Sequence, residues 1–174
     1  MRKLVAGPLT LEYSEGSLWN IGNGSEEAIR RIYLVFQDIN WTSRPFIIKD
    51  EIWDVADRSF IAKIKAQGSH DAKDLSVELE ITGSESGEIT YGFSASTAVS
   101  FMRNRLGLCL LHPVAGLAGR DCELTKADGA IEKSKFPDAI SPDQPFLNLS
   151  GISHRLQSGQ VASVKFEGEI FETE

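Results

Sequence analysis

The sequence predicts an all-β fold, a large antiparallel β-sandwich that is supersandwich-like. Short apolar runs separated by turn residues dominate the chain, and no long helix is evident. Between residues 75 and 82 apolar and polar side chains alternate strictly, which is typical of a strand with one solvated face. The chain has 174 residues, of which 41% are hydrophobic, enough for one sizeable core. We therefore expect a single domain over residues 1–174.

The first elements form a predicted hairpin. The run Leu9–Tyr13 alternates cleanly, residues 14–16 turn the chain, and residues 18–21 bring it back. A second turn follows at residues 22–25. Further strands are expected at residues 46–55, 59–65, 75–82, 89–97, 122–126, 131–135 and 161–166, with a turn at Asp128-Gly129.

The segment 26–36 fits two templates. Ile29, Ile32, Tyr33 and Phe36 lie at the spacing of one helix face, yet alternate residues of the same segment would also line the two faces of a strand. The run Ile-Tyr-Leu-Val-Phe is rich in β-branched and aromatic residues, which favours the strand. A helix remains the alternative.

The run Arg105–His112 is apolar or small on both faces beyond its first residue. This pattern predicts a strand that is central in a sheet and buried on both sides, covered by a third layer, a loop or another domain. Later in the chain, residues 136–150 contain Pro137, Pro142 and Pro145, which predicts a long ordered loop.

Composition excludes several classes of function. The net charge is −7 and no long basic cluster occurs, which argues against nucleic acid and against anionic membrane as partners. No apolar run approaches a membrane span, and the N-terminal apolar stretch is broken by Gly7-Pro8, so we expect a cytoplasmic protein. In that reducing compartment, Cys109 and Cys122 are expected to be buried thiols.

The familiar catalytic motifs do not occur in the sequence. It contains no phosphate-binding glycine loop, no His-Glu-x-x-His, no Cys-x-x-Cys and no Gly-x-Ser-x-Gly. The three histidines are widely spaced. We therefore assign no catalytic residue, no metal site and no cofactor from the sequence.

Two arginines at the start of the apolar run are candidate site residues. Arg103 and Arg105 flank Asn104 and are expected to share a strand face, where they would clamp a carboxylate or sugar hydroxyl groups. The structural alternative is an ion pair with Asp38 or with the proline-containing loop around Asp143.

Three further residues are candidates for substrate or interdomain contacts. His112 precedes a proline and is either a ligand contact or a core histidine. Asn40 and Trp41 combine an amide with an indole, a mixture suited to carbohydrate stacking. The alternative for Trp41 is a packed side chain in a turn.

Four segments resemble the N-terminal part of the bacterial D-apionate lactonases, and the resemblance runs along nearly the whole chain. They are EEAIRRIYLVFQDINW (26–41), FMRNRLGLCLLHP (101–113), FPDAISPDQPF (136–146) and VKFEGEIFETE (164–174). The resemblance implies hydrolysis of D-apionolactone to D-apionate in the catabolism of apiose. It also implies that a (β/α)8-like barrel follows a β-sandwich in a much longer protein.

If the resemblance holds, this chain is an N-terminal fragment that is inactive alone, with its catalytic residues elsewhere. Its partners would be a sugar lactone and a C-terminal barrel domain in the same protein, and that domain would cover the apolar strand. The alternative is a free-standing β-sandwich that binds carbohydrate or a protein.

Overall fold

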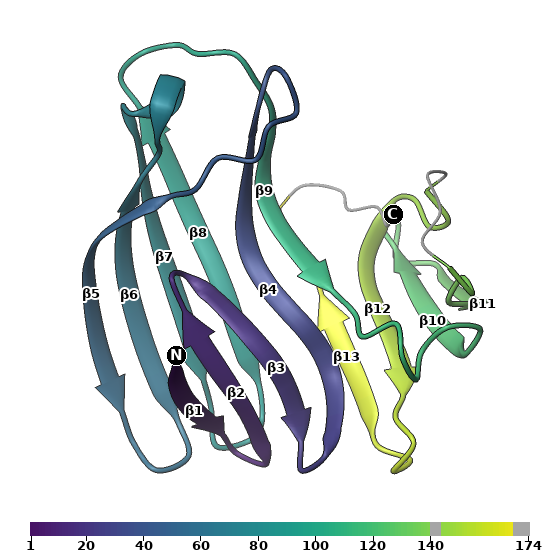
Figure 1. Cartoon of the computed structure of the whole chain (residues 1–174). Helices are drawn as coiled ribbons and strands as arrows, with labels where there is room; N and C mark the ends of the chain where they lie inside the picture. Colours follow the sequence, from purple (N-terminus) through teal and green to yellow (C-terminus); the bar gives the residue numbers. More distant parts are fainter. Residues whose placement is uncertain (140–143, 169–174) are drawn as a thin grey trace. The chain divides into compact units, whose positions relative to one another are not determined.

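The computed structural model describes residues 1–139 and 144–168, and these residues form two compact units, Met1–Leu111 (unit 1) and His112–Glu174 (unit 2). Three antiparallel sheets account for nearly all of the regular structure (Figure 1). Within the described residues, the one helical element is a short 3-10 turn, η1 (His70–Ala72). No described helix has the length and apolar character needed to cross a membrane. The predicted all-β fold is confirmed.

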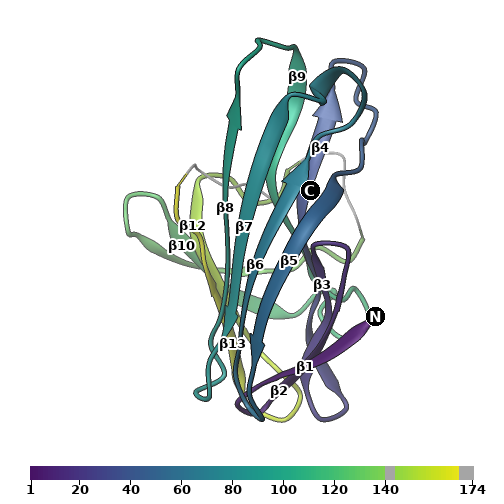
Figure 2. The ribbon, with the colours of Figure 1, turned by 90° about the vertical axis from the view of Figure 1, so that its left-hand side faces the viewer.

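Unit 1 contains two sheets. The first sheet has the order β1-β2-β3-β4-β9, with bounds β1 (Arg2–Ala6), β2 (Leu9–Ser14), β3 (Ser17–Asn23), β4 (Glu26–Asp38) and β9 (Arg103–Leu111). The second sheet is β5 (Ile47–Val55), β6 (Phe60–Gln67), β7 (Leu75–Gly83) and β8 (Ile89–Thr97), in that order. The strands of the second sheet run side by side in both views (Figures 1 and 2).

The core of unit 1 lies between these two sheets. The second sheet points alternate residues of β6 and β7 into the core, while the residues between them, polar except for Ile61, face outward. Two tyrosines join the layers: Tyr13 Oη donates a hydrogen bond to Glu51, and Tyr91 Oη donates one to the carbonyl of Gly16. The predicted sandwich is therefore present in unit 1. Its buried apolar residues include Leu4, Leu11, Leu18, Ile29 and Phe36 of the first sheet and Phe60, Ile64, Val77, Leu79 and Ile81 of the second.

The ambiguous segment is a strand, so the helix alternative is wrong. It forms β4, which pairs antiparallel with β3 on one side and β9 on the other. Two neighbours satisfy its backbone hydrogen bonds, and its β-branched and aromatic side chains pack on the pleated surface. The other expected strands are also present, with ends that shift by at most two residues.

The prediction that Arg105–His112 forms a central strand is wrong. Among the described residues, β9 is the edge strand of the first sheet and pairs only with β4. Its side chains from Asn104 to Leu110 are half-buried, Cys109 included, and His112 lies beyond its end. An apolar run indicates which faces of a strand are buried. It does not indicate whether the strand is paired on one side or on both.

Unit 2 contains the third sheet, in the order β11-β10-β12-β13. Its strands are β10 (Asp121–Lys126), β11 (Ile131–Lys135), β12 (Leu149–Arg155) and β13 (Val161–Lys165). A small core forms around Cys122, Leu124, Phe146, Leu149 and Ile152, with Phe136, Val164 and Phe166 against it. The predicted proline-containing loop ends at residue 148, because β12 begins at Leu149. Residues 140–143 of this loop lie outside the described residues.

Candidate functional site

Three connections meet at one end of unit 1, which we call the apical end. They are residues 39–46 between β4 and β5, residues 68–74 between β6 and β7, and residues 98–102 between β8 and β9. Because successive strands run in opposite directions, these connections emerge together, at the top of Figure 1. The connection 39–46 contains the candidate residues Asn40 and Trp41. The connection 98–102 leads directly into the candidates of β9, which begins at Arg103.

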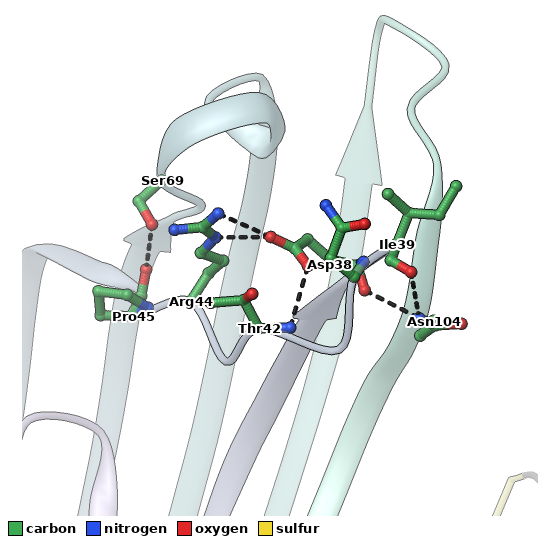
Figure 3. Close-up of polar contacts among 8 residues, drawn as sticks. Asp38, Ile39, Thr42, Arg44, Pro45, Ser69 and Asn104 are labelled. Carbon is green, nitrogen blue, oxygen red and sulfur yellow. Dashed lines mark hydrogen bonds and ion pairs between the residues drawn. The ribbon is translucent and has the colours of Figure 1, made fainter.

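Asp38 organises the first of these connections. Its buried carboxylate accepts hydrogen bonds through Oδ1 from the backbone N–H groups of Asn40 (2.9 Å) and Thr42 (3.0 Å). Through Oδ2 it binds the Arg44 guanidinium at 2.8 and 2.7 Å (Figure 3). Burial alone would raise the pKa of Asp38, but the hydrogen bonds from Thr42, Arg44 and Asn40 outweigh it and hold the pKa below its ordinary value.

The predicted ion pair between Asp38 and the arginines of β9 is therefore wrong. The structure assigns this carboxylate to Arg44, which lies six residues along the same connection. The second candidate partner, Asp143, lies outside the described residues. The pairing register also shifts here, since Gln37 faces Arg105 and Asp38 faces Arg103. The extra residue interrupts the regular alternation on which the prediction of a shared face depended.

Asn104 fastens β9 to the same turn. Its Nδ2 donates to the carbonyl of Asp38 (3.0 Å) and to the carbonyl of Ile39 (2.8 Å) (Figure 3). The connection between β6 and β7, residues 68–74, is attached as well, because Ser69 Oγ donates to the carbonyl of Pro45 at 2.8 Å. Beneath them, the buried ring of Phe36 contacts the rings of Phe46 and Phe101. The loops of the apical end thus hold one another in place.

Trp41 is displayed to solvent by this framework. Its φ is +63°, a left-handed value that is unfavourable for a bulky residue, and its side chain is 59% exposed. The backbone is held there because the Trp41 N–H donates to the carbonyl of Asp38 at 3.0 Å. The Arg105 guanidinium lies 5.3 Å from the indole centroid. The structure therefore brings Asn40, Trp41, Asn104 and Arg105 to one place, with Trp41 exposed instead of packed.

Sequence reasoning missed three exposed apolar residues at this end. Ile39, Val99 and Met102 have exposed fractions of 54%, 56% and 72%. It also missed Arg44 as the partner of Asp38. The available signal was the presence of large apolar residues inside segments that otherwise carry turn residues.

His112 belongs to unit 2, where it forms an aromatic cluster. Its ring centroid lies 5.4 Å from that of His154 and 5.2 Å from that of Phe136. Burial, with a smaller contribution from His154, lowers the pKa of His112 to about 4, so the imidazole is neutral at pH 7. Its Nε2 is buried and has no hydrogen-bond partner among the described residues. The core-histidine interpretation fits this placement, although Nε2 is not satisfied.

A shallow hollow of about 320 Å³ lies near the N-terminus of unit 1, lined in part by Arg2, Tyr13 and Glu51. Its polar groups engage one another: Tyr13 Oη donates to Glu51, and the Arg2 guanidinium lies 4.3 Å from the Trp53 centroid. Burial, followed by the hydrogen bond to Glu51, raises the pKa of Tyr13. This cluster joins β1, β2 and β5. In the part of the chain that the structure describes, no three metal-ligating side chains gather.

Comparison with known proteins gives a consistent result. The family model described as D-apionate lactonase, N-terminal domain, matches residues 1–174. The D-apionate lactonase of Brucella anthropi is 32% identical over 172 residues, which is 98% of this chain and 28% of the relative. The chain therefore spans less than a third of the length of that relative. No solved structure matches the chain significantly.

Proposed function

The chain belongs to the family of D-apionate lactonase N-terminal domains, and we propose that it serves as the N-terminal β-sandwich portion of a hydrolase that opens D-apionolactone to D-apionate. One observation carries the proposal: a match over 98% of this chain that covers 28% of a lactonase. In the reaction, water adds to the lactone carbonyl, the ring C–O bond breaks, and a sugar acid and an alcohol group result.

We place the catalytic residues in the remaining part of the longer protein, with the expected barrel domain as a partner in the same chain. The family match supports this division because the matched region is described as an N-terminal domain. A β-sandwich fold does not by itself imply hydrolase chemistry, because catalysis depends on particular side chains. The rest of the protein can supply those side chains.

Turnover of D-apionolactone tests the proposal. We expect the natural full-length protein to hydrolyse it and the isolated 174-residue chain to stay at the uncatalysed background. Robust hydrolysis by the isolated chain would move the catalytic residues into this domain. A full-length protein that opens other sugar lactones but not D-apionolactone would disprove the proposed substrate.

A second candidate function is a free-standing carbohydrate-binding module, which the exposed Trp41 beside Arg105 favours. Titration of the isolated chain with D-apiose or D-apionate, followed by tryptophan fluorescence, tests it. A saturable change that disappears in Trp41→Asn would support this module. A flat titration in both proteins argues against it.

A further inference from the structure

The apical end carries an unusual amount of exposed apolar surface. Ile39, Trp41, Val99 and Met102 are each more than half exposed. They come from two connections that lie together, because Asn104, two residues after Met102, is bonded to the carbonyl of Ile39. Single apolar side chains scattered over a surface need no explanation, but several gathered at one end indicate an interaction site.

The two connections that carry these residues match a protein interface in composition, whereas residues 68–74, the remaining connection of the apical end, contain Asp71, Lys73 and Asp74. Residues 39–46 and 98–103 contain no Asp, Glu or Lys, in a chain whose net charge is −7. They contain Trp, Met, Phe and Arg, which are the residues enriched where proteins bind one another. The carboxylate nearest in sequence, Asp38, already binds Arg44. Arg103 is exposed and gives the surface a positive margin.

The apical end is also rigid in its construction. Trp41 is held at positive φ by the Asp38 turn, and that turn is tied to β9 through Asn104. A surface that is ordered before binding loses less conformational entropy when a partner docks. Strain in a bulky, exposed residue is retained only where the surroundings enforce it, and such residues concentrate at functional positions.

We propose that the apical end, through Ile39, Trp41, Val99, Met102, Arg103 and Arg105, is the surface on which the remainder of the full-length protein docks. This rests on the proposed function. The occupant follows from length, since the matched region is 28% of the related lactonase and most of such a protein lies outside this domain. The partner's surface that docks here has an apolar centre, which receives the Trp41 indole and the Met102 thioether, and carboxylates that face Arg103.

Hydrogen exchange tests this surface in the isolated 174-residue chain and in the natural full-length protein. We expect amides of residues 39–46 and 98–102 to exchange about tenfold more slowly, or slower still, in the full-length protein. The polar turns 56–59 and 84–88 at the other end of unit 1 should exchange at the same rate in both proteins. Equal rates at residues 39–46 and 98–102 would overturn the proposal.

A matched pair of variants separates docking from folding. Met102→Gln should restore fast exchange at the apical end of the full-length protein and leave the isolated chain unchanged. Ile52→Gln, at a comparably exposed position on β5 (63%), should leave the exchange pattern of both proteins unaltered. An equal response to the two substitutions would contradict the proposal.

The remaining outcomes are distinguishable. Concentration-dependent protection of the apical end in the isolated chain, with dimers in sedimentation, would assign the surface to a second copy and overturn the proposal. A full-length protein without D-apionolactone activity but with a protected apical end refutes the proposed function and leaves the docking surface in place. An active protein with an unprotected apical end refutes the docking surface alone.

Discussion

The two ends of unit 1 turn the chain by different means. At the end opposite the apical end, which we call the basal end, polar turns connect the strands, and positive φ angles fall on glycines: Gly7 (+56°), Gly24 (+66°) and Gly87 (+88°). At the apical end the left-handed residues are Trp41 (+63°) and His70 (+55°), both exposed. Glycine adopts this backbone without strain, whereas a tryptophan does not.

The two ends therefore have different roles: the basal turns only connect strands, whereas the apical loops present side chains to solvent. The basal turns need only reverse the chain, and their exposed residues Asp57, Glu85 and Glu88 are solvated. The apical loops keep a strained backbone at Trp41, whose side chain is exposed to water. A buried carboxylate, Asp38, supports that arrangement through four hydrogen-bond contacts. Such a support is expected where exposed side chains have a binding role.

The core between the two ends sets the energetic scale. Leu18 is fully buried in β3, so Leu18→Ala should reduce the free energy of unfolding by about 2–5 kcal/mol. Leu108 of the edge strand β9 is only half-buried, and Leu108→Ala should cost about 1–2 kcal/mol. Urea denaturation of both variants measures the difference. Equal losses in the free energy of unfolding would show that Leu108 of β9 belongs to the core of the isolated chain.

Gly7→Ala probes the close packing of the basal end. A Cβ at Gly7 would lie 2.3 Å from the carbonyl oxygen of Glu85, on a backbone that already has positive φ. We expect a loss of about 2–4 kcal/mol, because backbone must shift to make room. Gly24→Ala is the control, since nothing lies within 4 Å of its added Cβ, and it should cost about 1 kcal/mol. Similar losses for both would show that the cost of replacing these glycines comes from backbone strain and not from the close approach of Glu85 to Gly7.

The acid response of unit 2 provides a contrast with the apical end. The pKa of His112 is lowered from 6.5 to about 4, so the unfolded chain binds a proton more readily than the folded one between these pH values. Stability is therefore complete above about pH 6.5 and declines as the pH falls toward 4, by about 2–3 kcal/mol for this group. Urea denaturation at pH 7.5 and pH 4.5 should show a smaller decline for His112→Phe than for the natural chain. An unchanged decline would assign the acid sensitivity to other groups.

Much of the fold was predictable because alternation and turn residues are local signals. The strand ends and the β4 assignment followed from them, whereas the resemblance to the lactonase family was carried by four longer segments of sequence. Two strands, β1 and β12, were missed because β1 lies directly before the Gly7-Pro8 break and β12 contains Gly151 and weak alternation. The pairing of Asp38 was not predictable, since Arg44 approaches it only after residues 39–43 close a turn. Exposure of Trp41 depends on a backbone angle that sequence patterns do not specify.

Asp38→Asn tests the support beneath the apical loops. Because its pKa is held below the ordinary value, Asp38 stabilises the folded chain above about pH 4, and this contribution is lost as the pH falls through the lowered pKa. At pH 7 the variant should lower the melting temperature modestly and accelerate amide exchange in residues 39–46. Its stability should depend less on pH below 4 than that of the natural chain. Normal exchange in residues 39–46 of the variant would mean that the hydrogen bonds of Asp38 do not hold this loop.

Thermal denaturation of Trp41→Gly, in the isolated chain and in the full-length protein, tests most directly whether the apical end presents its side chains for binding. Glycine removes the strain at φ +63° and sacrifices little packing, since the indole is 59% exposed. The isolated chain should therefore be as stable as the natural one within about 0.5 kcal/mol, or more stable. The full-length protein should lose stability, because the docked indole is gone. A loss of more than about 1 kcal/mol in the isolated chain, or no loss in the full-length protein, would contradict this account.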